Sequence, residues 1–541
     1  MQSRPAMAQD AAAIQAIQRQ ISDLQLQLKK LQSDAAKRDA ELKQAQAEAA
    51  QARADAQAAQ KAAMVPAAAA PAAGQMLPPG AIVMTQPAND KDAAGNPIQN
   101  PKKPNGKFTV GGVTVALGGF VDLTGYYRSR NESRGTSSSF SGIPFNGPTG
   151  QGDTSEFNMT AQNTRLSVRA DASTGADSAL TSYVEFDFNN GGGGANSVQS
   201  YSYTPRLRQA FVEYADSSWG TYALAGQAWS LATPFKRGLD PFQNFQPPTL
   251  DSSYLPGYEY LRVPLVRVVK TFGNANIGLE ADAPQTVFGG SAPTLANASV
   301  VNGYTGNGGL NPATTYSINS LPDVIGKVAL DTAFGHYEVY GVVRQFQDQT
   351  VYSLTGATNT VGGAATHSAV GGGAGASVFY PIMKYVDLQG TFLSGAGVGR
   401  YGAGGLPDVT YSSNGSPKPL HETMGEVGVI GHVLPVLDVY LFGGIDQIGR
   451  SFFGSSGGYG NPGANNAGCF NPNAGGSCAG NNYQLSGFTL GYNWTFLQGP
   501  FGKLQTGLQY SYVKREAYYG KGGEPTAIEN MVFANVRYTP F

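Results

Sequence analysis

Arginine residues recur in segments whose side chains alternate between apolar and polar types. Arg165 and Arg169 bracket the segment Arg165-Leu-Ser-Val-Arg169. In an extended chain both share one face with Ser167, because successive side chains of a β-strand point to opposite sides. The planar guanidinium of arginine binds both oxygens of a carboxylate, so a row of such side chains could bind or select small anions. The candidate residues for this role are Arg128, Arg165, Arg169, Arg206, Arg208, Arg262 and Arg344.

Several carboxylates could occupy the same face and cancel part of this positive charge. Net charge does not separate anion-binding cations from structural ion pairs, because 36 basic and 37 acidic residues give a formal charge of −1. Both interpretations of the arginines stay open at this point. The acidic candidates are Asp122, Glu185, Asp187, Glu213, Glu259 and Glu338.

A segment from Ala228 to Glu259 interrupts the alternating pattern with prolines and aromatic residues. Proline stiffens the backbone because its ring fixes φ. Two cations, Lys236 and Arg237, lie inside the run Pro234-Phe-Lys-Arg-Gly-Leu-Asp-Pro-Phe242. We expect this segment to fold inward and narrow a passage, with both cations facing it; an ordinary external loop is the alternative.

The sequence holds little material for metal or nucleophilic chemistry. Its 541 residues include only four His and two Cys. The histidines adjoin no metal-ligand spacing and no nucleophile motif, so we expect no catalytic residue, no metal and no cofactor. Cys469 and Cys478 lie in a stretch rich in Gly and Asn, where we expect a disulfide formed in an oxidising compartment. Two free thiols are the alternative.

The segment 107–541 supplies the elements that must position these side chains. Short and long stretches rich in Gly, Asn, Pro and Ser separate sixteen segments with period-2 patterning. Short turns at one end and long loops at the other are typical of an outer-membrane barrel, and their unequal lengths argue against a propeller. An arginine in lipid costs roughly 2–4 kcal/mol, so the arginines should face the interior. We predict an all-β transmembrane barrel of about 16 antiparallel strands. The segments are 117–130, 165–169, 179–189, 206–216, 221–229, 260–272, 274–283, 322–332, 335–347, 369–381, 384–394, 421–434, 436–450, 483–496, 502–516 and 527–541.

The residues before the barrel have a different character. Apolar residues recur at alternating spacings of three and four from Ile14 to Leu31, which predicts an N-terminal α-helical coiled coil. We assign 1–63 to this oligomerisation segment, with a lone amphipathic helix as the alternative. We assign 64–106, rich in Pro and Ala, to a linker, and 107–541 to the barrel. Ala6-Met7-Ala8 fits the end of a secretory signal and favours export, with a disordered start or an expression remnant as the alternative.

The composition agrees with a membrane barrel and excludes two other classes. Charged residues make up 13 % of the chain, about half of the usual share of about 25 %. The balanced charge lacks the basic excess of a nucleic-acid-binding protein. No run of about 18 apolar residues occurs, so we expect no transmembrane helix.

Together, the coiled coil, the linker and the barrel opening Gly118-Gly-Phe-Val-Asp-Leu-Thr-Gly-Tyr126 resemble the DcaP-like trimeric outer-membrane porins. Arg165-Leu-Ser-Val-Arg169 and Arg206-Leu-Arg-Gln-Ala-Phe-Val-Glu-Tyr214 share this resemblance. The ending Val536-Arg-Tyr-Thr-Pro-Phe541 is similar to the terminal-Phe signal of outer-membrane barrels. The resemblance implies a 16-stranded barrel, a homotrimer with its coil in the periplasm, and uptake of small anions, dicarboxylates among them.

We therefore expect a passive outer-membrane channel for small anionic solutes, with an arginine-lined lumen and the inward-folded loop as its constriction. Its expected contacts are outer-membrane lipid and, through the coil, peptidoglycan or a periplasmic partner. A mainly structural anchor that links the membrane to the cell wall is the alternative. An outer-membrane enzyme is a third hypothesis, and no motif supports it.

Overall fold

The computed structural model describes residues 106–147, 149–189, 197–353, 361–471 and 477–540. From the earlier part of the chain it describes only Lys29, which is helical. The predicted coiled coil and nearly all of the linker lie outside the described residues and stay predictions. Within the described residues, no helix is long and apolar enough to cross a membrane.

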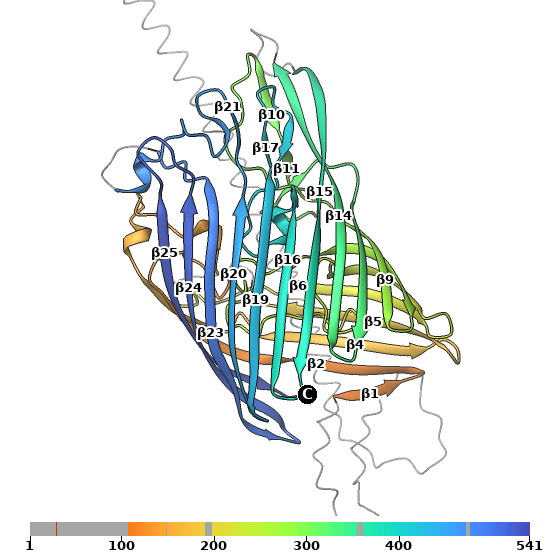
Figure 1. Ribbon diagram of the computed structural model, residues 1–541. Helices are drawn as coiled ribbons and strands as arrows, with labels where there is room; N and C mark the ends of the chain where they lie inside the picture. Colours follow the sequence, from red (N-terminus) through yellow and green to blue (C-terminus); the bar gives the residue numbers. More distant parts are fainter. Residues whose placement is uncertain are drawn as a thin grey trace, which may run out of the picture. The chain divides into compact units, whose positions relative to one another are not determined.

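Sixteen antiparallel strands, neighbours in the order of the sequence, form a closed barrel (Figure 1). Each of the sixteen predicted segments coincides with one of these strands, so the predicted barrel is confirmed. The strands are β2 (Val113–Arg128), β3 (Glu156–Thr160) in line with β4 (Arg165–Ser173), β5 (Ser178–Asp187), β6 (Arg206–Asp216), β7 (Thr221–Trp229), β8 (Arg262–Phe272), β9 (Ala275–Asp282), β13 (Asp323–Thr332), β14 (Gly335–Ser353), β15 (Val361–Ile382), β16 (Val386–Ala396), β19 (His421–Leu434), β20 (Leu437–Ile448), β23 (Asn482–Gly499), β24 (Gly502–Ala517) and β25 (Thr526–Thr539).

The barrel closes where β25 pairs with β2, from Tyr538 opposite Val121 to Met531 opposite Arg128. On its other side β2 pairs with both β3 and β4, which are two halves of one strand. The interruption between them is fixed to β2, since the backbone N–H of Asp122 donates to Thr164 Oγ1 at 3.2 Å. The last strand of the chain is therefore part of a continuous wall.

Short turns gather at one end of the barrel, where the C-terminal residues and β1 (Lys107–Val110) also lie (Figure 1). Long loops leave the other end, and three of them are 230–261, 397–420 and 449–481. The loops carry short strands: β10 (Ala298–Val301), β11 (Gly303–Thr305), β12 (Thr315–Ser317), β17 (Val409–Tyr411), β18 (Pro417–Pro419), β21 (Ser451–Phe453) and β22 (Gly457–Tyr459). They also carry the 3-10 helices η1 (Phe140–Gly142), η2 (Gln151–Asp153), η3 (Gly399–Tyr401) and η4 (Ala467–Cys469).

The hairpin of β14 and β15 is longer than the sequence predicts. The expected segments end at residue 347 and begin again at residue 369, whereas the strands reach Ser353 and begin at Val361. Gly, Ala, Thr and Ser dominate residues 361–369, so the contrast between apolar and polar side chains is lost there. Cross-strand pairing supplies what the pattern does not show: Gln349 pairs with Thr366 and Gln347 with Ser368.

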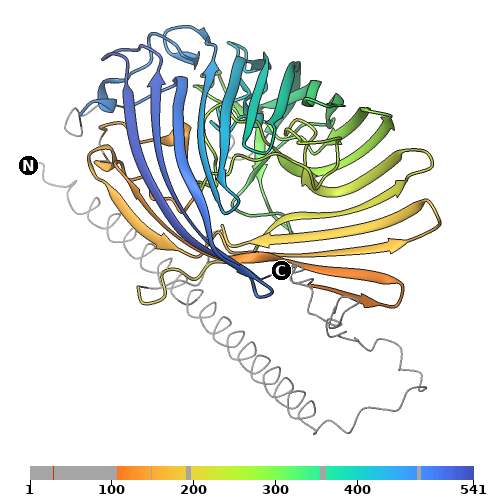
Figure 2. The same ribbon diagram turned by 60° about the horizontal axis from the view of Figure 1, so that its bottom comes forward.

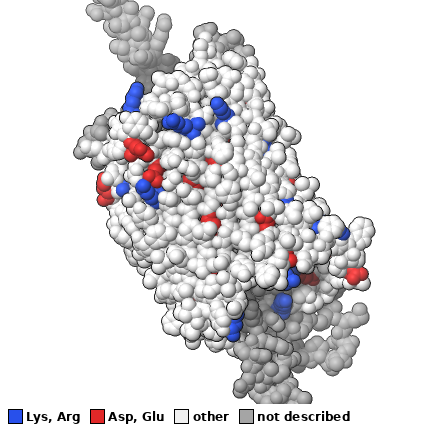
Figure 3. Space-filling view, in the orientation of Figure 1, with Lys and Arg blue, Asp and Glu red and all other residues white. Residues whose placement is uncertain are grey.

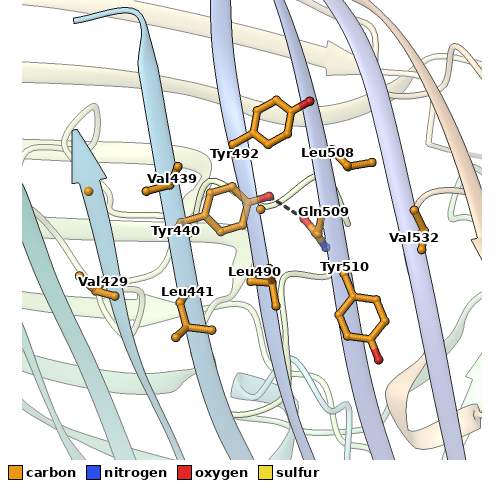
Figure 4. Close-up of a pocket in the computed structure, with 12 residues that line it drawn as sticks. Val429, Val439, Tyr440, Leu441, Leu490, Tyr492, Leu508, Gln509, Tyr510 and Val532 are labelled. Atoms are coloured by element: carbon orange, nitrogen blue, oxygen red, sulfur yellow. Dashed lines mark hydrogen bonds between the residues drawn. The ribbon is translucent and has the colours of Figure 1, made fainter. Parts of the chain in front are cut away.

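The outer wall presents apolar side chains at every second position. Leu441, Leu490 and Leu508 are each more than 40 % exposed. Their chain neighbours Tyr440 (next to Leu441) and Gln509 (next to Leu508) are at most 4 % exposed and point inward. Tyr440 Oη donates to Gln509 Oε1 at 3.0 Å behind an apolar depression of about 740 Å³ on β19–β25 (Figure 4). Most of this face carries no charged side chain (Figure 3). Such alternation is typical of a wall in contact with lipid.

Exposed aromatic side chains gather near the short turns, where they would meet a membrane–water interface. They are Trp219, Phe272, Phe334, Tyr385, Trp494 and Phe501. Together with the apolar wall above them, they mark one boundary of a membrane-spanning belt.

Candidate solute pathway

The loop 230–261, between β7 and β8, runs inside the ring of strands (Figure 2). Its residues Leu231, Phe235 and Leu239 are at most 2 % exposed. They pack against inward side chains of β8 and β13, among them Ile325, and so form an apolar core within the barrel. The inward course expected of this segment is thus observed, and it fills the lumen on one side.

A second loop, 397–420, also turns inward and joins the first. The Tyr260 N–H donates to Tyr401 O at 2.9 Å, and the Ala403 N–H donates to Tyr258 O at 2.9 Å. Sequence analysis does not predict this course, because the loop's Gly-rich stretch shows no apolar pattern. The two loops form one body that lies against β13, β14 and β19.

Arg344 of β14 clamps the second loop to the wall. Its guanidinium pairs with Asp323 of β13 at 3.0 Å and with Asp408 of the loop, and all three side chains are 0 % exposed. Arg400 adds a further ion pair to Asp323 at 3.1 Å. The expectation that Arg344 lines a passage therefore differs from the structure, because a loop covers this part of the inner wall.

Arg128 is sealed in the same way at the long-loop end of β2. It pairs with Glu156 at 2.8 Å and donates to Gly135 O at 2.8 Å, and its side chain is 0 % exposed. These contacts hold the loop 129–155 over the wall. Arg128 thus fixes this loop in place and does not line the open lumen that the sequence predicts for it.

The lumen also holds a cavity beside the first loop. A cavity of about 340 Å³ lies between the inner wall and residues 246–254 of the first loop. Leu250 N–H donates to Gln509 Oε1 at 2.5 Å, and Asn493 Nδ2 donates to Pro248 O at 3.0 Å, so the loop is attached to β23 and β24 above the cavity. The lining residues are Phe120, Asn163, Arg165, Arg208, Gln246, Pro247, Pro248, Thr249, Leu250, Asp251, Ser252, Tyr254, Asp438, Asn493, Gln505, Asn535 and Arg537.

Four predicted arginines form one cluster on the wall of β4, β5, β6 and β8 beside this cavity. Arg208 binds Glu185 at 2.6 Å and Asp187 at 2.7 Å. Arg206 also binds Asp187, at 2.7 Å, and Arg165 lies 3.7 Å from Glu185. Arg262 lies over the Trp229 ring at 4.9 Å and near Arg206 and Arg208. We call Arg165, Arg206, Arg208 and Arg262 the arginine cluster. In the described part of the chain, its ion pairs involve two carboxylates, Glu185 and Asp187.

The local charge of the arginine cluster is therefore positive. Arg165 and Arg206 keep 29 % and 35 % of their side chains exposed, so their charge reaches the lumen. Asp438 of β20 also lines the cavity, and His432 Nδ1 lies 2.7 Å from its carboxylate. The cavity thus has a cationic wall and a wall of mainly neutral polar groups.

Arg537 is a lining residue that sequence analysis missed. It pairs with Asp122 at 2.8 Å and lies 4.0 Å from the centre of the Phe120 ring, while Arg165 lies over the same ring at 5.3 Å. Arg537 belongs to the terminal motif, which the sequence analysis used only for its resemblance. The alternation of β25, with Val536 facing outward, already places the next side chain in the lumen.

Three other predicted cations lie nearer the short-turn end. Arg169 pairs with Asp171 at 2.9 Å and lies 4.2 Å from the centre of the Phe242 ring. Lys236 and Arg237 are exposed at the tip of the first loop, next to Gly238, whose N–H donates to Asp331 at 3.0 Å. Lys236 and Arg237 line a separate cavity of about 360 Å³ that also includes Asp331. They therefore lie at the mouth of the barrel, away from the cavity beside the arginine cluster.

Two loop carboxyl groups lie in the interior, where ionisation is unfavourable. Burial raises the pKa of Asp251 to about 6, although its Oδ1 accepts from the Ser253 N–H at 2.8 Å. Burial raises the pKa of Glu259 to about 8, and Tyr340 Oη donates to its carboxyl group. A protonated Glu259 lets the first loop cross the barrel without a buried negative charge.

Cys469 and Cys478 form a disulfide in the loop between β20 and β23. In the described part of the chain, no group of three or more His, Cys, Asp or Glu side chains could hold a metal ion. His336 lies between Asp331 at 2.8 Å and Glu338 at 3.0 Å, and its side chain is only 2 % exposed. His336 thus pairs with two carboxylates beside the cavity that Lys236 and Arg237 line.

The chain superposes on the crystal structure of the outer membrane channel DcaP of Acinetobacter baumannii with a TM-score of 0.54. It has the DcaP fold. Sequence identity is 17 %, and the match covers 79 % of this chain and 97 % of DcaP. The resemblance stated from the sequence is thus confirmed for the fold.

Two further solved structures match with lower scores. An anion-selective porin from Comamonas acidovorans is 12 % identical, with 79 % of this chain and 99 % of that chain covered and a TM-score of 0.40. Salmonella typhi OmpF in complex with daunomycin is 10 % identical, with 80 % and 99 % covered and a TM-score of 0.42. The sequence matches no protein-family model and no curated protein.

Proposed function

We propose that this chain is an outer-membrane porin of the DcaP-like type, through which small anionic solutes, dicarboxylates among them, diffuse passively. The observation that carries the proposal is the arginine cluster, where four guanidinium groups face two carboxylates beside an open cavity. An excess of fixed positive charge lowers the electrostatic barrier to the entry of an anion. The first inward loop acts as the constriction, because its residues 246–254 cover the cavity.

The same proposal includes the assembly. The chain would form a homotrimer in the outer membrane, with the segment 1–63 as a periplasmic coiled coil that could reach peptidoglycan or a periplasmic partner. The outward apolar positions and the aromatic side chains near the short turns support a lipid-embedded wall. The DcaP fold and the 3,4 repeat of the N-terminal segment support the assembly.

Recordings on the full chain in planar lipid bilayers test the channel. We expect conductance steps in groups of three and, in a gradient of potassium chloride, a reversal potential of the sign for chloride preference. A protein that inserts with native barrel structure and gives no conductance would contradict the channel function and favour the structural anchor.

Deletion of residues 9–63 tests the N-terminal segment separately. The deletion should leave single-channel conductance unchanged, because the described barrel closes without this segment. Loss of the triple steps alone would assign the segment to trimer formation. Loss of insertion would show that barrel assembly requires it.

A further inference from the structure

Carboxamide side chains also line the cavity, on strands that β2 separates from the arginine cluster. Asn493, Gln505 and Asn535 come from the three neighbouring strands β23, β24 and β25, and all three line the cavity. They form a second chemical surface, which we call the amide wall. The cationic residues facing the same cavity are Arg165, Arg208 and Arg537.

Each residue of the amide wall uses one end of its carboxamide within the protein. Asn493 donates to Pro248 O at 3.0 Å, Gln505 to Thr495 Oγ1 at 2.9 Å, and Asn535 to Asp122 Oδ2 at 2.8 Å. In the described part of the chain, no hydrogen bond occupies the other end of any of the three. These bonds fix the amide planes, so three oriented acceptors remain for whatever enters the cavity.

Such a surface suits a particular kind of anion. A carboxylate satisfies the guanidinium groups, but an alkyl chain behind it would leave the amide wall without partners. Hydroxyl groups can donate to the amide oxygens, and a site that hydrogen-bonds hydroxyl groups discriminates against the analogue that lacks them. The cavity, about 340 Å³, is near the lower end of the range for small-molecule sites.

We propose that the cavity between the arginine cluster and the amide wall preferentially binds polyhydroxylated monocarboxylates, that is, sugar acids, during their passage. The inference rests on the proposed channel function and specifies its substrate class. The carboxylate binds on the side of Arg165 and Arg208, and the hydroxyl groups donate to Asn493, Gln505 and Asn535. An amino acid is a weaker fit, because of the two carboxyl groups among the lining residues Asp438 already has His432 at 2.7 Å and Asp251 is only 1 % exposed.

Solute-induced current block in bilayers containing the full chain tests the assignment. Gluconate is compared with hexanoate, which has the charge without the hydroxyl groups, and with sorbitol, which has the hydroxyl groups without the charge. Gluconate should block at concentrations about three- to tenfold lower than hexanoate, as expected for one gained hydrogen bond, and sorbitol should block least.

One variant attributes the preference to the amide wall. Gln505→Met keeps the side-chain volume and removes the acceptor, so it should weaken gluconate block about three- to tenfold and leave hexanoate block unchanged. Gln498→Met, at an exposed position near the short-turn end of β23, is the matched control and should change neither. Arg165→Gln should weaken block by both anions.

The possible outcomes separate the two proposals. Equal block by gluconate and hexanoate in a conducting, anion-preferring channel would overturn the sugar-acid assignment and leave the channel function intact. Stronger block by a neutral amino acid such as serine would overturn it too. Absence of conductance in a folded, inserted protein would instead refute the channel on which the assignment rests.

Discussion

The two sides of the lumen use the same residue types in different ways. On the side of β8, β9, β13 and β14, two oppositely charged pairs are sealed: Arg267 with Glu280 at 2.7 Å and Lys327 with Glu338 at 3.0 Å, all 0 % exposed. We call this the filled side. On the open side, next to β4–β6 and β23–β25, Arg165 keeps 29 % of its side chain exposed and borders a cavity.

This difference shows that exposure and pairing decide the role of an arginine in this barrel. On the filled side, two inward loops exclude water, and a buried charge there must have a partner because desolvation is costly. On the open side, Arg165 and Arg206 are partly exposed, so water screens their charge and an excess of cations is tolerated. A cationic residue on the inner wall is therefore a candidate for solute binding only where no loop covers it.

The largest effect is expected from breaking the clamp on the filled side. Arg344→Ala leaves Asp323 and Asp408 buried without their cation, which should lower the free energy of unfolding by about 3–5 kcal/mol. Urea unfolding of the protein in lipid vesicles measures this change. Arg450→Ala, which removes an exposed loop arginine, is the control, and an equal effect of both substitutions would contradict the clamp.

A second comparison sets a core residue of the filled side against a lining residue of the open side. Leu231→Ala removes a fully buried side chain from the apolar core and should lower the free energy of unfolding by about 2–5 kcal/mol. Gln505→Ala, beside the cavity, should lower it by about 1 kcal/mol or less. The same urea titration measures both, and similar values would show that the two sides are equally packed.

Glu259 gives the filled side a pH dependence. Its pKa rises from an ordinary value of 4.5 to about 8 in the folded chain, because burial disfavours the carboxylate. The folded state thus holds a proton that the unfolded state releases, and the free energy of unfolding falls as pH rises from about 4.5 to about 8.

Glu259→Gln removes this contribution. The difference in stability between the variant and the unmodified protein should therefore shift in favour of the variant as pH rises from 5 to 9. The urea midpoints of the two proteins measure this difference. Glu524→Gln, at an exposed loop position, is the control and should show no such shift. A difference between Glu259→Gln and the unmodified protein that stays constant with pH would contradict the assignment.

Sequence reasoning recovers the barrel because its evidence is local. Alternation places Leu441 outward and Tyr440 inward, and the cost of charge in lipid assigns all seven strand arginines to the inner side. It predicts too long a loop at 348–368, because the Gly and Ala residues there show no alternation of apolar and polar side chains, although the two strands pair across part of this segment.

The same reasoning cannot divide the inner wall into its filled and open sides. Whether Arg344 faces a solute depends on where the loop 397–420 lies, and no local pattern encodes that course. The partners of these arginines are also distant in sequence: Arg344 pairs with Asp408, and Arg537 pairs with Asp122. Side-chain type therefore identifies candidates, while the long-range contacts choose among them.

The smallest expected effect concerns selectivity. Arg262 contributes one positive charge to the arginine cluster and does not bring a further carboxylate with it. Arg262→Gln should therefore reduce the preference for chloride in part and leave conductance nearly unchanged. The reversal potential in a salt gradient measures this preference. Arg450→Gln, which removes a cation at the rim, is the control, and an equal shift would mean that overall charge, not the cluster, sets selectivity.

The most direct test of the account is the reversal potential of the unmodified full chain in a gradient of potassium chloride. An excess of two positive charges in the arginine cluster predicts the sign for chloride preference, and it predicts that raising the salt concentration weakens this preference by screening. A reversal potential of the sign for potassium preference, or none at low salt, would contradict the claim that the open side of the lumen selects anions.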